Sequence, residues 1–205
     1  MVTVSTSDIT ARTYHHGDLR AALIDAGLNS LEGTDAEAIS LRELARIVGV
    51  SATAVYRHFP DKRALLAALA ATGITRLGEV QRTASEAAGG GADGFAATGR
   101  AYVRFALAHP ALFRLAFSHG EFAGSPGLGN DEAARLLRDY ATQFAGADAQ
   151  RLTLQAWAVA HGLAMLMLDG LLPEDDATIN AVIDARTLFA GKTKEPTTGS
   201  TPPAF

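Results

Sequence analysis

The sequence contains no cysteine and only one tryptophan among its 205 residues. Without cysteine it can form neither a disulfide framework nor a thiolate metal site, and we expect a reducing, cytoplasmic environment. Residues 1–8 lack a basic stretch followed by an apolar run, so we expect no signal peptide. Period-two alternation of apolar and polar residues stands out nowhere, and the sequence therefore predicts an all-α fold.

A surplus of positive charge is also missing, because the formal net charge is −4. The range 12–65 carries seven Lys and Arg residues against seven Asp and Glu residues. This balance argues against a protein that coats nucleic acid indiscriminately. Basic side chains nevertheless gather near the end of this range: Arg57, His58, Lys62 and Arg63. A local basic edge on a neutral domain favours site-specific docking over bulk electrostatic binding.

A mostly apolar, uncharged stretch of 17 residues covers 152–168. Its length is at the lower limit for a membrane-spanning helix, and it contains Gln155 and His161. A helix buried within a bundle or a dimer explains this stretch better than a bilayer does, so no membrane association is expected.

The segment 40–62 predicts two short helices joined by a tight turn. Apolar residues at i, i+3, i+4 and i+7 define the buried face of the first helix: Leu41, Leu44, Ala45 and Val48. Ser40 and Glu43 have the spacing of a capping box, and Gly49 can end the helix. Ser51 then caps a second helix, about 51–58. This layout is typical of a helix-turn-helix, whose second helix enters the DNA major groove.

In the second short helix, two apolar residues, Val55 and Phe59, point one way. Ala52, Thr53 and Tyr56 lie on the opposite side, so we expect them to be free to contact DNA.

Around this motif the sequence resembles a known family. Two parts of it are similar to the DNA-binding domain of the TetR (tetracycline-repressor) family. The first part is Ala45 with the turn Gly49–Ser51, and the second is the run Val55–Lys62 followed by Ala64–Leu66. The resemblance implies a three-helix DNA-binding domain over 14–66 and a larger helical regulatory and dimerisation domain over 67–190. We expect a flexible arm over 1–13 and a disordered tail over 191–205.

The resemblance also implies the residues that contact double-stranded DNA. Short side chains at Ala52 and Thr53 can approach base edges. The remaining expected contacts are to phosphates or along the backbone, and they are Ser51, Tyr56, Arg57, His58, Lys62, His15 and His16. Tyr56 and His58 could instead complete a small core, and His15 and His16 could be a solvated lead-in.

Further helices are expected along the chain, with the second and third already described. Their approximate bounds are 17–31, 61–86, 95–108, from Pro110 onward, 131–145, 149–172 and 175–190. Asp61 is the expected N-cap of the long fourth helix. The glycine-rich stretch 87–94 contains Gly-x-Gly-x-x-Gly, but a dinucleotide site requires a preceding strand. We therefore interpret 87–94 as a linker.

The motif Trp157–Gly162 resembles the Trp…His-Gly signature of one group of TetR regulatory domains, which implies a ligand pocket and pairing through the last two helices. Candidate pocket residues are Phe105, Phe113, Phe117, Phe144, Trp157, His161 and Met165. Candidate dimer residues are Leu154, Ala158, Met165, Ile179, Val182 and Ile183. Taken singly, each aromatic residue is better explained as ordinary core, and His161 as a hydrogen-bonded core histidine, although it could also hydrogen-bond a ligand.

Motifs for catalysis are not found. His119–Gly120–Glu121 resembles the His-x-Glu of zinc deaminases, but that chemistry needs paired cysteines. We expect no cofactor, no metal and no enzymatic activity. The resemblance implies a homodimeric repressor that a small, largely apolar effector releases from a pseudo-palindromic operator. The alternative is an all-α small-molecule-binding protein or enzyme that uses the C-terminal pocket.

Overall fold

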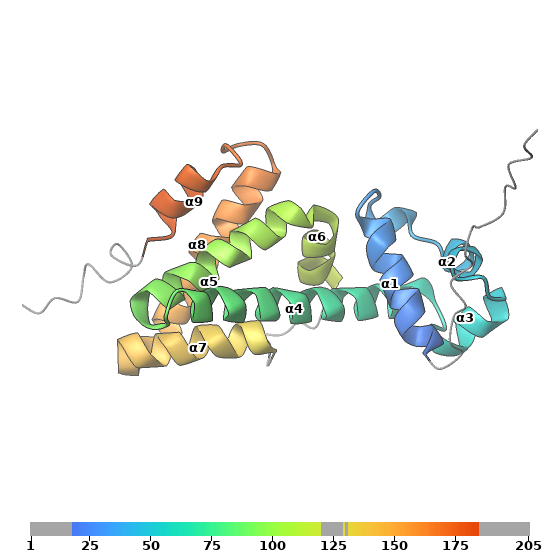
Figure 1. Ribbon diagram of the computed structural model, residues 1–205, viewed down its shortest axis with the longest axis horizontal. Coiled ribbons are helices and arrows are strands. Elements are labelled where there is room, and N and C mark those ends of the chain that lie inside the picture. The colour runs from blue at the N-terminus through green and yellow to red at the C-terminus, as the bar shows by residue number, and fades with distance from the viewer. Residues whose placement is uncertain (1–17, 120–128, 130, 185–205) are drawn as a thin grey trace, which may run out of the picture.

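The structure is a computed structural model that describes residues 18–119, 129 and 131–184. Every regular element in these residues is helical, as the sequence predicted (Figure 1). In chain order the elements are α1 (Leu19–Leu31), η1 (Ala36–Ala38), α2 (Leu41–Val48), α3 (Ala52–His58), α4 (Lys62–Ala87), α5 (Gly91–Ala108), α6 (Pro110–His119), α7 (Glu132–Ala145), η2 (Gly146–Asp148), α8 (Ala149–Leu168) and α9 (Asp176–Val182). The long α4 runs through the molecule, with α1–α3 at one end and α5, α7, α8 and α9 around the other.

The N-caps of α3 and α4 are the predicted ones. Ser51 Oγ accepts a hydrogen bond from Ala54 N at 3.2 Å, and Asp61 Oδ1 accepts one from Ala64 N at 2.7 Å. Each bond satisfies a backbone donor that has no partner within its own helix. The sequence thus predicted correctly where α3 and α4 begin.

The predicted capping box at the start of α2 is wrong. Ser40 occupies the N-cap position, but its side chain makes no capping bond. Glu43 instead forms an ion pair with Arg46 one turn later, at 2.6 Å. Gly49, with a φ of 77°, ends α2 as predicted, because a residue without a Cβ adopts this left-handed conformation readily.

Two predicted boundaries move in the C-terminal half. α5 begins at Gly91 rather than near 95, so the linker after α4 is much shorter than 87–94. α8 ends at Leu168 rather than 172, because the chain turns at Gly170 with a φ of 70°. The last helix, α9, ends at Val182, and the predicted continuation to 190 lies mostly outside the described residues.

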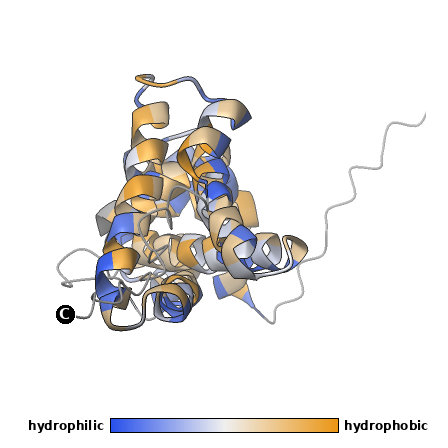
Figure 2. Cartoon of the chain, turned by 90° about the vertical axis from the view of Figure 1, so that its left-hand side faces the viewer, coloured by the Kyte–Doolittle hydropathy of each residue, from blue (hydrophilic) through white to orange (hydrophobic). Residues whose placement is uncertain are grey.

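One large apolar core runs through both halves of the molecule. It includes Leu23 of α1, Leu69 of α4, Leu112 of α6 and Met167 of α8. The end-on view in Figure 2 shows hydrophobic and hydrophilic residues alternating along the helices. A second, smaller cluster joins α5, α7 and α8 through Phe95, Tyr140, Ala141 and Leu152. Because α4 contributes to the core at both ends, the two halves are packed as one body.

Within the described residues, none of the helices has the length and apolarity needed to cross a membrane. The apolar stretch 152–168 belongs to α8, whose Leu163, Ala164 and Met167 are buried against the rest of the protein.

Candidate nucleic-acid interface and ligand cavity

Helix α3, the second helix of the predicted helix-turn-helix, is held by two buried side chains. Val55 is 0% exposed and Phe59 is 1% exposed, and both belong to the main core. Buried Ala45 of α2 is small enough for the two helices to approach closely. α3 is therefore fixed in orientation by packing on one side only.

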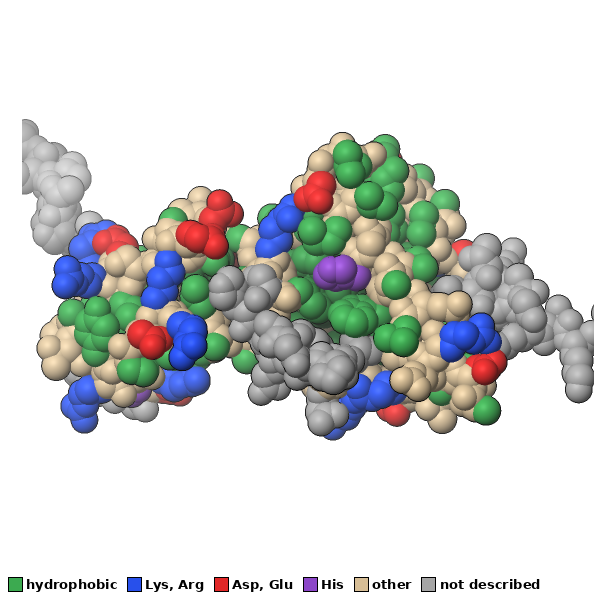
Figure 3. Space-filling view, turned by 180° about the vertical axis from the view of Figure 1, so that it is seen from behind, with side chains coloured by type: hydrophobic (Ala, Val, Ile, Leu, Met, Phe, Trp, Pro, Cys, Tyr) green, Lys and Arg blue, Asp and Glu red, His purple; other side chains and the backbone are tan. Residues whose placement is uncertain are grey.

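The other side of α3 faces solvent. Thr53, Tyr56, Arg57 and His58 are exposed, and Tyr56 is an exposed aromatic residue at 44%. Ser51 is also exposed, and Ala52 is half-buried. Figure 3, in which α1–α3 lie at the left, shows several Lys and Arg side chains over this end of the molecule. The structure thus brings together the predicted DNA-contacting residues of α3 on one accessible face.

Some charged residues near α3 already have partners. Arg46 pairs with Glu43, and the guanidinium of Arg20 lies 5.4 Å from the centre of the Phe59 ring. Lys62 is half-buried, and its Nζ donates a hydrogen bond to the carbonyl oxygen of Glu37. The Lys62 ammonium therefore has a partner within the chain that the sequence did not indicate. The predicted arm residues His15 and His16 lie outside the described residues.

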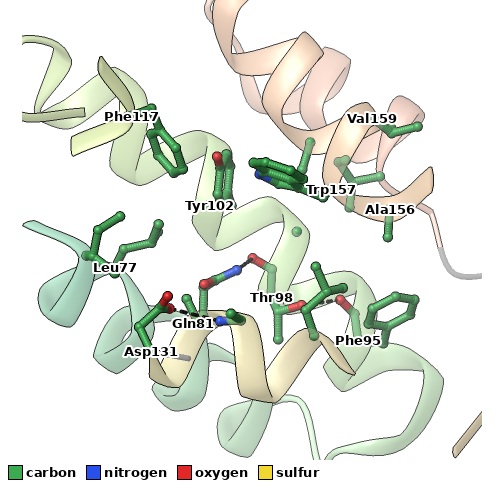
Figure 4. Close-up of a pocket in the computed structure, with 17 residues that line it drawn as sticks. Leu77, Gln81, Phe95, Thr98, Tyr102, Phe117, Asp131, Ala156, Trp157 and Val159 are labelled. Carbon is green, nitrogen blue, oxygen red and sulfur yellow. Dashed lines mark hydrogen bonds between the residues drawn. The ribbon is translucent and has the colours of Figure 1, made fainter. Parts of the chain in front are cut away.

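A cavity lies in the C-terminal half, among α4, α5, α7 and α8 (Figure 4). Its walls enclose about 660 Å³ of free space, which includes the opening to solvent. As a cavity volume, this space measures only about 50 Å³. Since typical small-molecule pockets measure about 300–1,000 Å³, a ligand of ordinary size would have to part these walls.

The lining is mostly apolar, with a few polar groups. Leu77 and Gln81 come from α4, Phe95, Thr98 and Tyr102 from α5, and Trp157 from α8. The other lining residues are Ile74, Gly99, Phe117, Asp131, Ala133, Ala134, Leu137, Ala156, Val159, Ala160 and Ile183. An apolar cavity with a few polar atoms suits a small organic ligand.

Tyr102 connects the cavity to the predicted histidine. Its hydroxyl lies 2.9 Å from His161 Nδ1. Burial raises the pKa of Tyr102 well above its ordinary value, so the hydroxyl stays protonated. Burial lowers the pKa of His161, which leaves its imidazole neutral at pH 7 and able to accept this hydrogen bond. The neighbouring Trp157 indole opposes this rise in the Tyr102 pKa, although its Nε1 has no hydrogen-bond partner among the described residues.

The predicted pocket residues separate into two groups. Phe117 and Trp157 line the cavity. Phe113 and Phe105 are buried in the main core, and Met165 packs against that core. Phe144 belongs to the smaller cluster, where its ring stacks on Tyr140 with centroids 6.0 Å apart. His161 does not line the cavity itself, and it touches the site through Tyr102.

The predicted dimer residues also differ in exposure. Leu154 and Ala158 are exposed on α8, and Val182 is exposed on α9. Met165 is half-buried, whereas Ile179 and Ile183 are buried inside the protomer. Ile183 also lines the cavity.

Two family models match the chain. The model of bacterial regulatory proteins of the tetR family matches residues 23–69, and that of the tetracyclin repressor-like C-terminal domain matches residues 95–186. The chain belongs to the TetR family of transcriptional regulators. It is a DNA-binding transcriptional regulator, and homodimers are typical of this family.

Solved structures agree with this TetR-family assignment. A protein of unknown function from Rhodococcus sp. RHA1 is 35% identical, with a TM-score of 0.72 over 88% of this chain and 98% of that chain. A possible TetR family transcriptional regulator from Streptomyces coelicolor A3(2) is 25% identical, with a TM-score of 0.56 over 84% of this chain and 85% of that chain.

TetR from Acinetobacter baumannii AYE, at 19% identity, shares the fold with a TM-score of 0.58 over 84% of this chain and 95% of that chain. A variant of that protein has been solved in complex with minocycline. A comparison with curated proteins gave no match.

Four polar cavity residues of this TetR-family chain were missed by sequence reasoning: Gln81, Thr98, Tyr102 and Asp131. One signal for Gln81 was available. It follows Ile74 and Leu77 at positions i+7 and i+4, and therefore continues the apolar face of α4 with a polar group.

Proposed function

We propose that the chain is a repressor that binds a pseudo-palindromic operator as a homodimer. The observation that carries this proposal is the asymmetry of α3, with Val55 and Phe59 in the core and Thr53, Tyr56 and Arg57 in solvent. A helix that is anchored on one side and polar on the other is suited to enter the major groove.

Homodimerisation is proposed through α8. Its exposed side carries Leu154, Ala158 and Leu166, with Gly162 in line with them at four-residue intervals. A Cβ placed on Gly162 would meet nothing within 4 Å, so this face is open to a second helix. Two copies that pair through such a face are related by a two-fold axis, and a symmetric dimer presents two recognition helices to two half-sites.

Release by a small, largely apolar effector is proposed through the cavity. α4 begins directly after α3 and its cap, and it lines the cavity further along with Leu77 and Gln81. A ligand that parts the cavity walls would therefore act on the helix that carries the DNA-binding end. Such coupling requires that the ligand bind one conformation better than the other. The minocycline complex of the A. baumannii TetR variant supports a small-molecule site in this fold by analogy.

The experiment is a selection of DNA fragments from a random pool, followed by affinity measurements on the selected sequence at several salt concentrations. Arg57→Ala should lower the dependence of log Kd on log salt by about one unit, because one phosphate contact is lost. Arg135→Ala is the matched control, since it removes the same charge from an exposed position on α7. Thr53→Ala should change the base preference at one operator position and leave the salt dependence alone.

Equal effects of Arg57→Ala and Arg135→Ala would refute the docking of α3. If the selection recovers no preferred sequence, the proposal that the chain binds a specific operator is wrong. That result would favour the alternative of a small-molecule-binding protein or enzyme.

A further inference from the structure

Two polar atoms at the cavity are buried without a hydrogen-bond partner among the described residues: Gln81 Oε1 and Trp157 Nε1. They come from different walls, since Gln81 lies on α4 and Trp157 on α8 (Figure 4). One atom is a hydrogen-bond acceptor and the other a donor. Buried polar groups are nearly always paired, so this combination points to a ligand or to ordered water that pairs them.

The orientation of the Gln81 amide is fixed by its other end. Its Nε2 donates to the backbone carbonyl oxygen of Thr98 at 3.2 Å, and a carbonyl can only accept. Oε1 is therefore the atom left without a partner. The residue is 7% exposed, so bulk water does not solvate this oxygen freely.

The neighbouring polar groups cannot easily serve these two atoms. The Tyr102 hydroxyl donates to His161 Nδ1, and Thr98 Oγ1 donates to the carbonyl oxygen of Phe95 at 2.7 Å, so neither hydroxyl has a proton left for Gln81 Oε1. The Tyr102 oxygen keeps lone pairs that could accept, but no hydrogen bond joins it to Trp157 Nε1. Gln81 Oε1 and Trp157 Nε1 are thus the buried polar atoms of the described lining that have no hydrogen-bond partner and can pair with a bound molecule.

The charge of the lining restricts the ligand further. Asp131 is the one residue of the described lining that carries a charge, and its Oδ1 caps α7 by accepting from Ala134 N at 3.0 Å. Neither lysine nor arginine occurs in this lining. A carboxylate or phosphate ligand would therefore lose its hydration without gaining a cation, and would face a negative charge.

We infer that the cavity selects a neutral, mainly apolar molecule with a hydrogen-bond donor for Gln81 Oε1 and an acceptor for Trp157 Nε1. This inference rests on the proposed function, in which the cavity is the effector site. Phenols and secondary amides carry both groups on a small apolar frame. A pure hydrocarbon binds less well, because it displaces water and leaves both protein atoms unpaired.

The test uses four matched naphthalenes and isothermal titration calorimetry on the full chain. The compounds are 2-naphthol, which donates and accepts, 2-methoxynaphthalene, which only accepts, 2-ethylnaphthalene, which does neither, and the anion 2-naphthoate. We expect 2-naphthol to bind about three- to tenfold more tightly than 2-methoxynaphthalene, and the latter to exceed 2-ethylnaphthalene by a similar factor. The anion should bind weakest of all.

Two variants assign these differences to individual atoms. Gln81→Met keeps the length of the side chain and should abolish the advantage of 2-naphthol over 2-methoxynaphthalene. Trp157→Phe keeps an aromatic ring and should abolish the advantage of 2-methoxynaphthalene over 2-ethylnaphthalene. Gln143→Met is the matched control, because Gln143 is exposed on α7 and does not line the cavity. Thermal unfolding verifies that each variant is folded, and if Trp157→Phe does not fold, Gln81→Met alone decides the test.

Equal affinities for the three neutral compounds, no binding of any of them, or preference for 2-naphthoate would overturn the inference. Operator release is measured separately with the same compounds. If they bind in the expected order without releasing DNA, the effector role is wrong and the chemistry of the cavity stands. If the compounds release DNA but bind the Gln81→Met and Trp157→Phe variants as tightly as the unchanged protein, this inference is wrong. The effector would then bind at another site.

Discussion

Gly94→Ala is expected to destabilise the protein through one close contact between helices. A Cβ at this position of α5 would lie 2.5 Å from Tyr140 Oη and 3.1 Å from Ser85 Oγ. These two hydroxyls are hydrogen-bonded to each other between α4 and α7 and are buried. The added methyl group must therefore displace Tyr140 and break this hydrogen bond.

The cost can be estimated from its parts. Overpacking costs about 1–3 kcal/mol, and a buried hydrogen bond left unmade costs about 1–3 kcal/mol. Replacing glycine by alanine in a helix returns about 1 kcal/mol. The free energy of unfolding should thus fall by about 1–5 kcal/mol, which for a chain of this length lowers Tm by about 2–20 °C.

The assay is thermal and urea unfolding followed by circular dichroism, at one fixed protein concentration because dimerisation affects Tm. Tyr140→Phe removes the hydroxyl and keeps the ring that stacks on Phe144. In the double variant Gly94→Ala/Tyr140→Phe, the alanine methyl group no longer meets the tyrosine hydroxyl. Its loss in free energy of unfolding should therefore be clearly smaller than the sum of the losses of the two single variants. Gly33→Ala serves as the control, because a Cβ there meets nothing within 4 Å. If the two single losses add to within about 0.5 kcal/mol, the proposed contact does not exist.

Three further predictions concern the recognition helix, pH and assembly. Ser51→Ala removes the N-cap of the short α3 and should lower the free energy of unfolding by about 1 kcal/mol. Operator affinity should fall, while its dependence on salt stays unchanged. Intact operator affinity would contradict a structural role for this cap. Burial lowers the pKa of His161 from 6.5, so the unfolded chain takes up a proton first and stability should fall as pH drops below about 6.5. In urea unfolding between pH 7 and pH 5, His161→Gln should show a shallower fall, and parallel curves would argue against this burial. Leu154 is 47% exposed on α8, and Leu154→Glu should give monomers in sedimentation, whereas Ile47→Glu, on α2 and 52% exposed, should leave dimers intact. Dimers of Leu154→Glu would place the interface elsewhere.

Local sequence signals predicted most of the fold. The caps Ser51 and Asp61 and the terminating Gly49 mark helix ends through short-range bonds that residue types reveal directly. The apolar spacing of Val55 and Phe59 predicted which side of α3 is buried, because that face depends only on helical periodicity.

The cavity was harder to predict, because it depends on which faces of distant helices meet. Phe113 and Phe144 are as aromatic as Trp157, yet they pack into two different clusters. Gln81 lines the cavity although its residue type suggests a solvent-exposed position. Glu43 pairs with Arg46 and not with the backbone of Ser40 as predicted, because both partners lie within one helix turn of it. The surroundings of the aromatic residues and of Gln81 are decided by tertiary packing, which the order of residues alone does not reveal. The pairing of Glu43 is instead a competition between local partners on an exposed helix turn.

The continuity of α4 has a geometric consequence for regulation. From Lys62 to Gln81 the helix rises about 28 Å, at about 1.5 Å per residue. A tilt of about 5° about the Gln81 end would displace the Lys62 end by about 2.5 Å. Successive base pairs in DNA are about 3.4 Å apart, so this displacement is most of one base-pair step. In a dimer, each α4 carries an α3 at its end, so the distance between the two α3 helices would change by a comparable amount. A rotation of α4 by a few degrees would then be enough to mismatch the two α3 helices with an operator of fixed half-site spacing.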